Sequence, residues 1–278
     1  MKIDLHVHTT ASDGTESPAH IVELALEAGL AAVAVTDHDT ADGCREALEA
    51  GERLGLEVVP GIELSTKFHA SVHILGYYID AQSPHLLPVL EWMVNDRNQR
   101  NRRIAELMAS DGLPVSYDEM QRRFSGVIGR PHFAELLVEF GLAEDVSDAF
   151  RRFMNRGEKY YIGRSFLPLD RSIEIILLAG GVPVLAHPFQ YRMDDAELRE
   201  LIEYCIGKGL RGMECRYSGY RPDQVAYLEK LAAEYGLIRT GGSDFHGTSK
   251  PHIRIGSGTG ALDVPCRYLE ELKTAAGR

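Results

Sequence analysis

The sequence predicts an α/β protein in which seven strands and their connecting helices form a barrel, interrupted by a small inserted helical domain. Two observations support this fold class. Strand patterns of period two alternate with helical patterns through residues 1–81 and again through residues 166–278. Residues 82–165, between these parts, show only helical periodicity. Parallel strands joined by right-handed helical crossovers close into a barrel, whose functional groups gather at the C-terminal strand ends.

The first strand illustrates the pattern, because Ile3, Leu5 and Val7 alternate with polar residues over positions 3–8. The other six strands are expected at residues 31–35, 56–60, 72–79, 182–186, 210–217 and 237–240. Polar motifs follow most of these strands. The sequence therefore places many polar side chains at one end of the barrel.

The helices between the strands carry start and stop signals. Ser17 and Pro18 provide a cap and a first-turn proline, and Gly29 closes the first helix. Further barrel helices are expected at residues 42–54, 173–179, 195–206 and 222–236. The inserted domain is expected to contain helices at residues 86–110, 117–124, 131–140 and 146–155. Because the insert lies between two barrel strands, we expect it to stand over the barrel mouth as a lid.

The composition fits one folded domain of barrel size that carries an insertion. Of the 278 residues, 44% are apolar, and no uninterrupted apolar run reaches the roughly 18 residues of a membrane span. The four cysteines are scattered, which is typical of reduced thiols. We therefore expect a cytoplasmic protein without membrane contact. A net charge of −11 argues against non-specific coating of nucleic acid, because such binding depends on Lys and Arg.

Candidate metal ligands occur where predicted strands end. Six short segments carry them, namely His6 with His8, His38, Glu63, His73, His187, and Asp244 with His246. Imidazole and carboxylate groups are the usual ligands of zinc, manganese and iron. The sequence therefore predicts one metal cluster at the barrel mouth. A lone histidine in a strand is usually an ordinary core or surface residue, so the prediction depends on the recurrence.

These motifs resemble the PHP domain (polymerase and histidinol phosphatase) of the amidohydrolase superfamily. Its signature segments correspond here to residues Asp4–Thr9, Thr36–Asp39, Gly61–Glu63, Ala186–Pro188 and Gly242–His246. Two further segments, Ser12–Gly14 and Gly129–Phe133, resemble the branch that hydrolyses 3′,5′-bisphosphorylated nucleotides. That branch also includes exoribonucleases that trim RNA from a 5′-phosphate. The resemblance covers nearly the whole chain and implies a distorted seven-stranded barrel.

The resemblance also implies ligands for two or three divalent metals. A first metal would be held by His6, His8, Glu63 and Asp244, a second by Glu63, His73 and His187, and a third by Asp13, His38 and His246. Glu63 can bridge the first two because a carboxylate has two oxygens. Asp13 stands where other family members have histidine, and its harder oxygen favours manganese or iron there. Manganese is the expected metal, with iron and zinc as alternatives.

The expected chemistry is hydrolysis of a phosphate ester. Two adjacent cations lower the pKa of a bridging water, so that hydroxide attacks without a side-chain nucleophile. Glu63, Asp244 and His246 are the catalytic candidates, and we expect a third metal or a water near His246 to assist the leaving oxygen. The residues expected to bind a second phosphate and the nearby ribose are Arg97, Arg100, Arg130, His132 and His246. The planar fork of arginine pairs two phosphate oxygens at once.

Other interpretations remain open. The arginines of residues 97–103 could form the solvated face of a helix. The histidines expected at the surface are His20, His69, His85 and His252. Some residues nevertheless lie close enough in sequence to the candidate ligands to reach the barrel mouth, namely His69, His252, Lys67, Tyr217 and Lys250. The cluster could instead serve a phosphatase of the histidinol-phosphate type or a carbon–nitrogen hydrolase, or stabilise a binding domain without catalysis.

The expected partner is a small phosphorylated nucleotide or the 5′-phosphorylated end of a single-stranded RNA. A lid near the barrel mouth would admit a thin single strand and exclude a duplex. No protein partner can be inferred from the sequence.

Overall fold

The computed structural model describes residues 2–69, 71–124, 128–163 and 165–278. The chain divides into two compact units. The first comprises Met1–Leu90 with Phe166–Arg278, and the second comprises Glu91–Ser165. The sequence pattern places the start of the insert at residue 82, whereas the second unit begins at Glu91.

Eight strands in the described part of the first unit form one sheet: β1 (Lys2–Val7), β2 (Leu30–Val35), β3 (Glu57–Lys67), β4 (Ser71–Tyr77), β5 (Leu167–Pro168), β6 (Val182–Leu185), β7 (Gly212–Tyr217) and β8 (Ile238–Gly242). Seven follow the order β1-β2-β3-β4-β6-β7-β8, and the short β5 pairs with β3. The sheet edges meet where Val7 bridges to Phe245 and where Asp244 N donates to His6 O (2.8 Å). The predicted α/β barrel of seven strands is therefore confirmed, and it is nearly closed.

The prediction that all strands run parallel is wrong for β4, which is antiparallel to both β3 and β6. Only residues 68–70 separate β3 from β4 in the sequence, and a parallel connection needs about a dozen residues for its crossover. The strand β3 also extends beyond the expected range 56–60, so Glu63 lies within it. Because β4 is reversed, His73 near its start lies across from Ser65 of β3.

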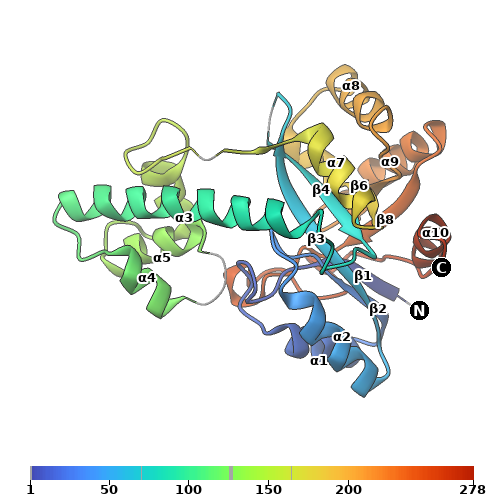
Figure 1. The fold of residues 1–278 in the computed structure, drawn as a ribbon, viewed down its shortest axis with the longest axis horizontal. Coiled ribbons are helices and arrows are strands. Elements are labelled where there is room, and N and C mark those ends of the chain that lie inside the picture. Colours follow the sequence, from blue (N-terminus) through green and yellow to red (C-terminus); the bar gives the residue numbers. More distant parts are fainter. Residues whose placement is uncertain (1, 70, 125–127, 164) are drawn as a thin grey trace. The chain divides into compact units, whose positions relative to one another are not determined.

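The helices of the first unit are α1 (Pro18–Glu27), α2 (Gly43–Leu54), α7 (Leu169–Leu178), α8 (Asp195–Ile206), α9 (Pro222–Glu234) and α10 (Arg267–Ala275), with 3-10 turns η2 (Pro188–Tyr191) and η3 (Gly247–Ser249). In Figure 1, α1 and α2 lie beside β2, and α7 lies beside β6. Ser17 caps α1 by accepting from His20 N (3.2 Å), and Asp194 and Glu197 form a capping box on α8. The sequence reasoning missed α10.

Two hydrophobic clusters hold the barrel strands in place. One contains Leu75, Val184 and Leu272, and so joins β4 and β6 to α10. The other contains Val33 and Ile21, and so joins β2 to α1. Burying one such side chain contributes about 1.5–3 kcal/mol. These clusters anchor the strands whose ends carry the polar motifs.

The second unit contains most of α3 (Leu87–Ser110), then α4 (Tyr117–Arg123), α5 (Arg130–Glu139), α6 (Val146–Ala149) and the π-helical turn η1 (Phe150–Met154). The first three agree with the predicted helices within one residue at each end. The fourth predicted helix, at residues 146–155, is divided between α6 and η1. Ile104, Met108, Phe133 and Leu137 are buried in a separate core of this unit. None of the described helices is both long and apolar enough to cross a membrane.

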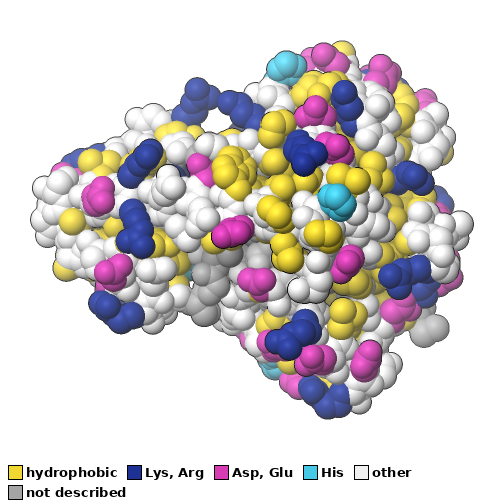
Figure 2. Space-filling model, in the orientation of Figure 1, with side chains coloured by type: hydrophobic (Ala, Val, Ile, Leu, Met, Phe, Trp, Pro, Cys, Tyr) yellow, Lys and Arg dark blue, Asp and Glu magenta, His cyan; other side chains and the backbone are white. Residues whose placement is uncertain are grey.

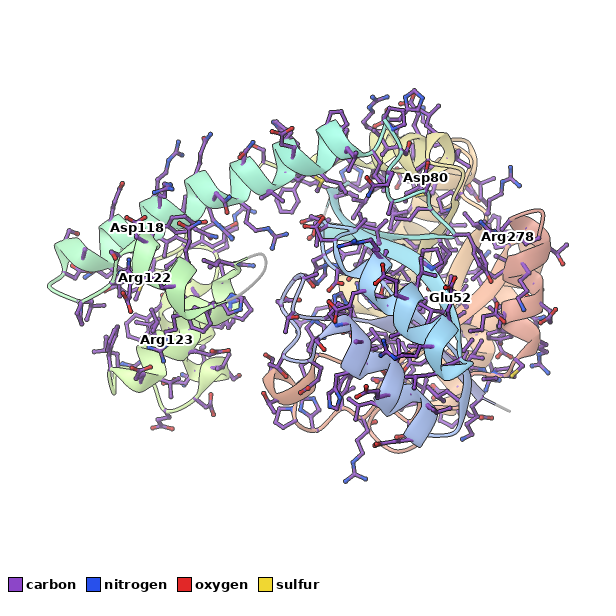
Figure 3. All side chains as sticks on the ribbon, turned by 60° about the horizontal axis from the view of Figure 1, so that its bottom comes forward. Glu52, Asp80, Asp118, Arg122, Arg123 and Arg278 are labelled. Atoms are coloured by element: carbon purple, nitrogen blue, oxygen red, sulfur yellow. The ribbon has the colours of Figure 1, made fainter. Side chains whose placement is uncertain are left out.

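The formal charge is divided unequally between the units. Residues 91–165 contain twelve Lys and Arg and twelve Asp and Glu, so the net charge of −11 belongs to the first unit. Acidic and basic side chains are interspersed on the face shown in Figure 2. Arg122 and Arg123 of α4 (Figure 3) pair with Glu119 (2.5 Å) and with Glu139. Such exposed ion pairs contribute little to stability.

Closure of the barrel depends on a glycine. A Cβ on Gly242, at the end of β8, would lie 2.3 Å from His6 Cβ and 2.4 Å from His6 N. We expect Gly242→Ala to push β8 away from β1 and to lower the free energy of unfolding by about 1–3 kcal/mol, measured by urea denaturation. Gly207→Ala is the matched control, because its Cβ would meet atoms only at 3.4 and 3.6 Å. Equal destabilisation of the two variants would contradict this role of Gly242.

Candidate metal centre

The candidate ligands converge at one end of the barrel. His6 lies on β1, Glu63 within β3 and His73 near the start of β4. The other candidates follow β1, β2, β6 and β8, and they are His8, Asp13, His38, His187, Asp244 and His246. Contacts between these side chains connect all nine into one cluster.

The carboxylate of Glu63 lies at the centre of the cluster. Its Oε2 is 3.3 Å from His6 Nε2, 3.2 Å from His8 Nε2 and 3.0 Å from His38 Nδ1. Its Oε1 is 2.8 Å from His73 Nδ1 and 2.9 Å from His187 Nε2. The two oxygens therefore face different groups of imidazoles, which is the arrangement that a bridging carboxylate requires.

Asp244 completes the group on the Oε2 side of Glu63. Its Oδ1 lies 3.2 Å from His8 Nε2 and 3.7 Å from His6 Nε2. The backbone of Asp244 is left-handed, with φ of 56°, and its N–H donates to His6 O. His6, His8, Glu63 and Asp244 therefore surround one position.

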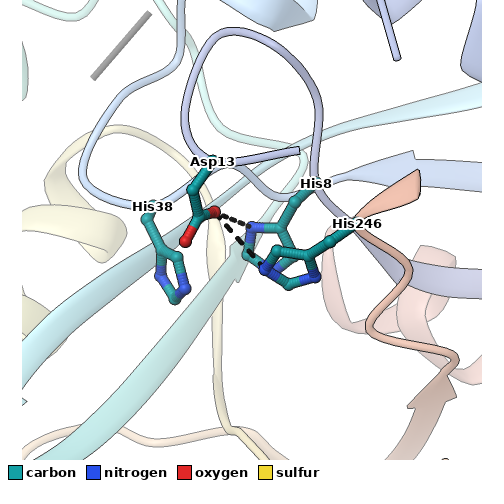
Figure 4. A group of neighbouring side chains, drawn as sticks. All are labelled: His8, Asp13, His38 and His246. Carbon is teal, nitrogen blue, oxygen red and sulfur yellow. Dashed lines mark ion pairs between the residues drawn. The ribbon is translucent and has the colours of Figure 1, made fainter. Parts of the chain in front are cut away.

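A further group lies around Asp13 (Figure 4). Asp13 Oδ1 is 3.3 Å from His246 Nε2 and 3.9 Å from His8 Nδ1. Together with His38, these residues offer donor atoms that all lie within 4.8 Å of one another. His38 is shared, because it also belongs to a group with Glu63 and His73.

The chemistry of the donor set fits divalent cations. Both ring nitrogens of His8 are buried and make no hydrogen bond of normal geometry to the described residues. The Nδ1 atom of His187 is in the same situation. Buried polar atoms without partners are costly, and coordination to a cation would satisfy an imidazole lone pair. The nine residues therefore fit the metals that the sequence predicts.

The electrostatics of the cluster favour ionised carboxylates. Burial would raise the pKa of Glu63, but the charges of His38 and His73 hold it well below its usual value. Burial likewise opposes ionisation of Asp244, whose pKa is instead held well below its usual value by Lys250 and His246. The negative charge that a cation needs is therefore present.

The pKa values of three imidazoles in the cluster are also shifted. Burial alone would lower the pKa of His8, but the nearby carboxylates of Asp244 and Glu63 raise it to about 9. Burial also opposes protonation of His6, whose pKa is nevertheless raised well above its usual value by Glu214 and Glu63. The pKa of His38 falls to about 3 because burial outweighs the neighbouring acids.

Glu214 of β7 is a site residue that sequence reasoning missed. It is fully buried, its Oε1 lies 3.0 Å from His6 Nδ1, and its Oε2 accepts from His187 N (2.7 Å). His187 has a positive φ of 24°, so this hydrogen bond supports a strained backbone. The available signal was an acid between Met213 and Cys215, in the middle of the strand predicted at residues 210–217.

Tyr217 and Lys250, which lie close in sequence to candidate ligands, contact one of those ligands in the structure. Tyr217 OH donates to Asp244 Oδ2 (2.6 Å), and Lys250 Nζ donates to the same oxygen (2.7 Å). The side chain of Lys250 is 35% exposed. These two donors fix one oxygen of Asp244, so its other oxygen is directed toward the imidazoles.

Two buried acids hold the ligand-bearing loops without contacting the cluster's imidazole nitrogens. Asp4 accepts from Ser243 N (2.8 Å) and from Gly256 N (2.7 Å). Asp37 accepts from Thr9 N (2.7 Å) and from Ser12 Oγ (2.6 Å). Burial raises the pKa of both carboxyl groups. They anchor the loops that follow β1 and β8.

The candidate substrate residues lie in the second unit, with the exception of His246. Arg97 and Arg100 are buried, with 8% and 6% of their surface exposed. Arg130 Nη1 donates to Met154 O (3.2 Å), and His132 Nδ1 accepts from Gly129 N (2.9 Å). The solvated-face interpretation therefore does not describe Arg97 and Arg100.

Known proteins resemble this chain over most of its length. The PHP domain family matches residues 4–205. The 5′-3′ exoribonuclease Rnm of Escherichia coli is 35% identical over 257 residues, which cover 91% of this chain and 87% of that protein. The 3′,5′-nucleoside bisphosphate phosphatase of Chromobacterium violaceum is 32% identical over 270 residues, which cover 96% and 94%.

A solved structure extends the comparison to the fold. The crystal structure of a proposed metal-dependent phosphoesterase from Bifidobacterium adolescentis is similar with a TM-score of 0.86 and 34% sequence identity. The match covers 99% of this chain and 98% of that chain.

The contact between Glu214 and His6 predicts a change of tautomer in Glu214→Gln. The amide oxygen of glutamine can still accept from His187 N, but its NH₂ group would donate to His6 Nδ1. The proton would then move to His6 Nε2, the nitrogen that faces Glu63. We expect metal binding to weaken roughly 10–100-fold, measured by metal analysis, with the tautomer read by ¹⁵N NMR.

Glu229→Gln provides the control for this substitution. Glu229 pairs with Arg216 (2.8 Å) outside the cluster, so this variant should retain metal. An unaltered His6 tautomer together with full metal content in Glu214→Gln would refute the role assigned to Glu214.

Proposed function

This chain belongs to the PHP domain family, and from that premise we propose that it removes the 3′-phosphate of nucleoside 3′,5′-bisphosphates. We propose further that it shortens 5′-phosphorylated single-stranded RNA from the 5′ end. Its homologues and structural neighbours are metal-dependent phosphoesterases, and it is an enzyme of this class. The observation that carries the proposal is the convergence of five imidazoles on the Glu63 carboxylate, within a cluster of nine candidate ligands.

The metals are part of the proposal. We propose two or three divalent ions, held by His6, His8, Glu63 and Asp244, by Glu63, His73 and His187, and by Asp13, His38 and His246. Manganese is favoured because three of these ligands are carboxylates, with iron and zinc as alternatives. When bound, such ions supply Lewis acidity to a phosphate ester and to the attacking water.

The chain's own residues orient this chemistry. Glu63 and Asp244 are proposed to hold the metals, which would position the reacting phosphate and the attacking water. We assign the group around His246 to stabilisation of the departing ribose oxygen. Asp13 supports this role, because its Oδ1 lies 3.3 Å from His246 Nε2 and so fixes the ring orientation. His246 is only 4% exposed, so packing also restricts the orientation of its ring.

Recognition of the second phosphate is assigned to Arg97, Arg100, Arg130 and His132. Their unit carries no net formal charge, in contrast to the acidic first unit, so an anion is not repelled there. Helix α5 begins at Arg130, with Pro131 in its first turn, and such a helix start favours anions. A bidentate arginine would distinguish a bisphosphate from a monophosphate.

The proposed function is tested by comparing substrates on the manganese-loaded protein. The panel contains a nucleoside 3′,5′-bisphosphate, a nucleoside 5′-monophosphate, histidinol phosphate and a 5′-phosphorylated oligoribonucleotide. We expect phosphate release from the bisphosphate and stepwise shortening of the oligonucleotide, with little release from the monophosphate. Preferred hydrolysis of histidinol phosphate would replace the proposal with the histidinol-phosphate type of phosphatase.

Arg130→Ala tests the recognition of the second phosphate. Loss of a charged hydrogen-bonding pair costs about 1.5–3 kcal/mol, so we expect KM for the bisphosphate to rise at least about tenfold while metal content stays constant. Arg103→Ala, an exposed arginine on α3, is the matched control. Because Arg130 also contacts Met154, an unfolding measurement must show that the variant is folded. An unchanged KM in a folded variant would remove Arg130 from the site.

A further inference from the structure

A separate cavity of about 430 Å³ lies in the first unit. Its walls come from η2, which follows β6, and from the first turns of α8 and α9, so it opens at the end of the barrel that carries the metal centre. The apolar lining consists of Phe189, Met193, Leu198 and Tyr227. None of these residues is among the nine candidate metal ligands. The volume falls in the range of small-molecule pockets.

Two tyrosine rings separate this cavity from the metal centre. The ring of His187 lies 5.5 Å from that of Tyr217, which lies 5.2 Å from that of Tyr220. The ring of Tyr220 lies 5.3 Å from that of Phe189, and Phe189 N donates to Tyr220 OH (3.0 Å). A chain of contacting rings thus leads from a candidate metal ligand to the cavity wall.

The polar lining selects against anions. Asp194, Asp195 and Asp223 line the cavity. Arg221 also lines it, but its guanidinium makes two hydrogen bonds to Asp223, of 3.0 and 2.8 Å. Asp195 accepts from Arg199 Nε (3.0 Å) and from Tyr227 OH, and Asp194 accepts from Glu197 N (2.9 Å). A phosphate would meet a net negative surface here, whereas N–H groups of a ligand would meet the remaining lone pairs of these carboxylates.

The apolar lining selects for a planar ligand. The rings of Phe189 and Tyr227 lie 5.9 Å apart and are tilted by 41°, and both side chains are only half-buried. Aromatic faces of this kind stack with any base, since every base has a π-face. The cavity therefore fits an uncharged planar ring that carries N–H donors.

We propose that this cavity binds the base of the nucleotide that follows the cleaved phosphate in a 5′-phosphorylated single strand. The inference rests on the proposed function, because it assumes that the 3′-phosphate of the first nucleotide lies at the metal centre. In a nucleoside 3′,5′-bisphosphate that phosphate ends the molecule and no second base exists. Occupation of the cavity therefore distinguishes an RNA end from the small substrate.

The test measures binding of two dinucleotides to the manganese-loaded protein and to Tyr227→Ala. Both ligands carry a 5′-phosphate and a non-hydrolysable methylene in place of the bridging 3′-oxygen, and one of them lacks the second base. Because stacking on an aromatic side chain carries a large share of such binding, we expect Tyr227→Ala to raise Kd for the intact ligand roughly tenfold. Removal of the second base should weaken binding to the wild-type protein by a similar factor and binding to Tyr227→Ala by less than about threefold.

Tyr235→Ala is the matched control. Tyr235 OH donates to Glu203 (2.7 Å), as Tyr227 OH donates to Asp195, but Tyr235 lies at the other end of α9. It should bind both ligands as the wild-type protein does. Equal loss of both ligands in Tyr227→Ala, or no effect of the second base in the wild-type protein, would overturn the inference. Failure of the proposed function would show itself differently, as absence of turnover on bisphosphate and RNA alike. Base-dependent binding would still be measurable in that case.

Discussion

The burial of the Glu63 carboxylate among five imidazoles is the constraint on which the rest of the structure depends. An ionised carboxylate is costly to bury unless charged or hydrogen-bonding groups surround it. The compensating rings arrive from β1, from β4 and from the loops after β1, β2 and β6. The barrel must therefore be nearly closed, and the β3–β4 hairpin must turn back, before this carboxylate is satisfied. The contacts that close the barrel therefore also assemble the site.

Much of the barrel could be predicted because its signals are local. The alternation of Ile3, Leu5 and Val7 marks β1, and the hydrophobic pattern locates the strands that carry or precede the ligand motifs. It does not give the C-terminal limit of β3, within which Glu63 lies. The direction of a strand depends on the length of the connection before it and is not encoded in the strand's own residues. Only three residues separate Lys67 from Ser71. The length of this connection, more than its composition, would have predicted the reversed β4.

The rest of the site depends on contacts that no local pattern contains. Glu214 meets His6 across 208 positions of the sequence, and Lys250 is recognisable only through the left-handed turn that presents Asp244. The sequence also does not show which arginines of the inserted helices are buried. Arg97 and Arg100 lie three residues apart on α3 and are buried, whereas the neighbouring Arg102 is exposed. Only the packing within that unit separates them.

The meeting of β1 with the segment after β8 has a consequence for synthesis of the protein. His6 and His8 are translated before Asp244 and His246, and most of the barrel lies between them in the sequence. During elongation, the early imidazoles face solvent without the carboxylate that completes their group. A chain that ends before β8 therefore lacks two of the nine candidate ligands and cannot assemble the complete cluster.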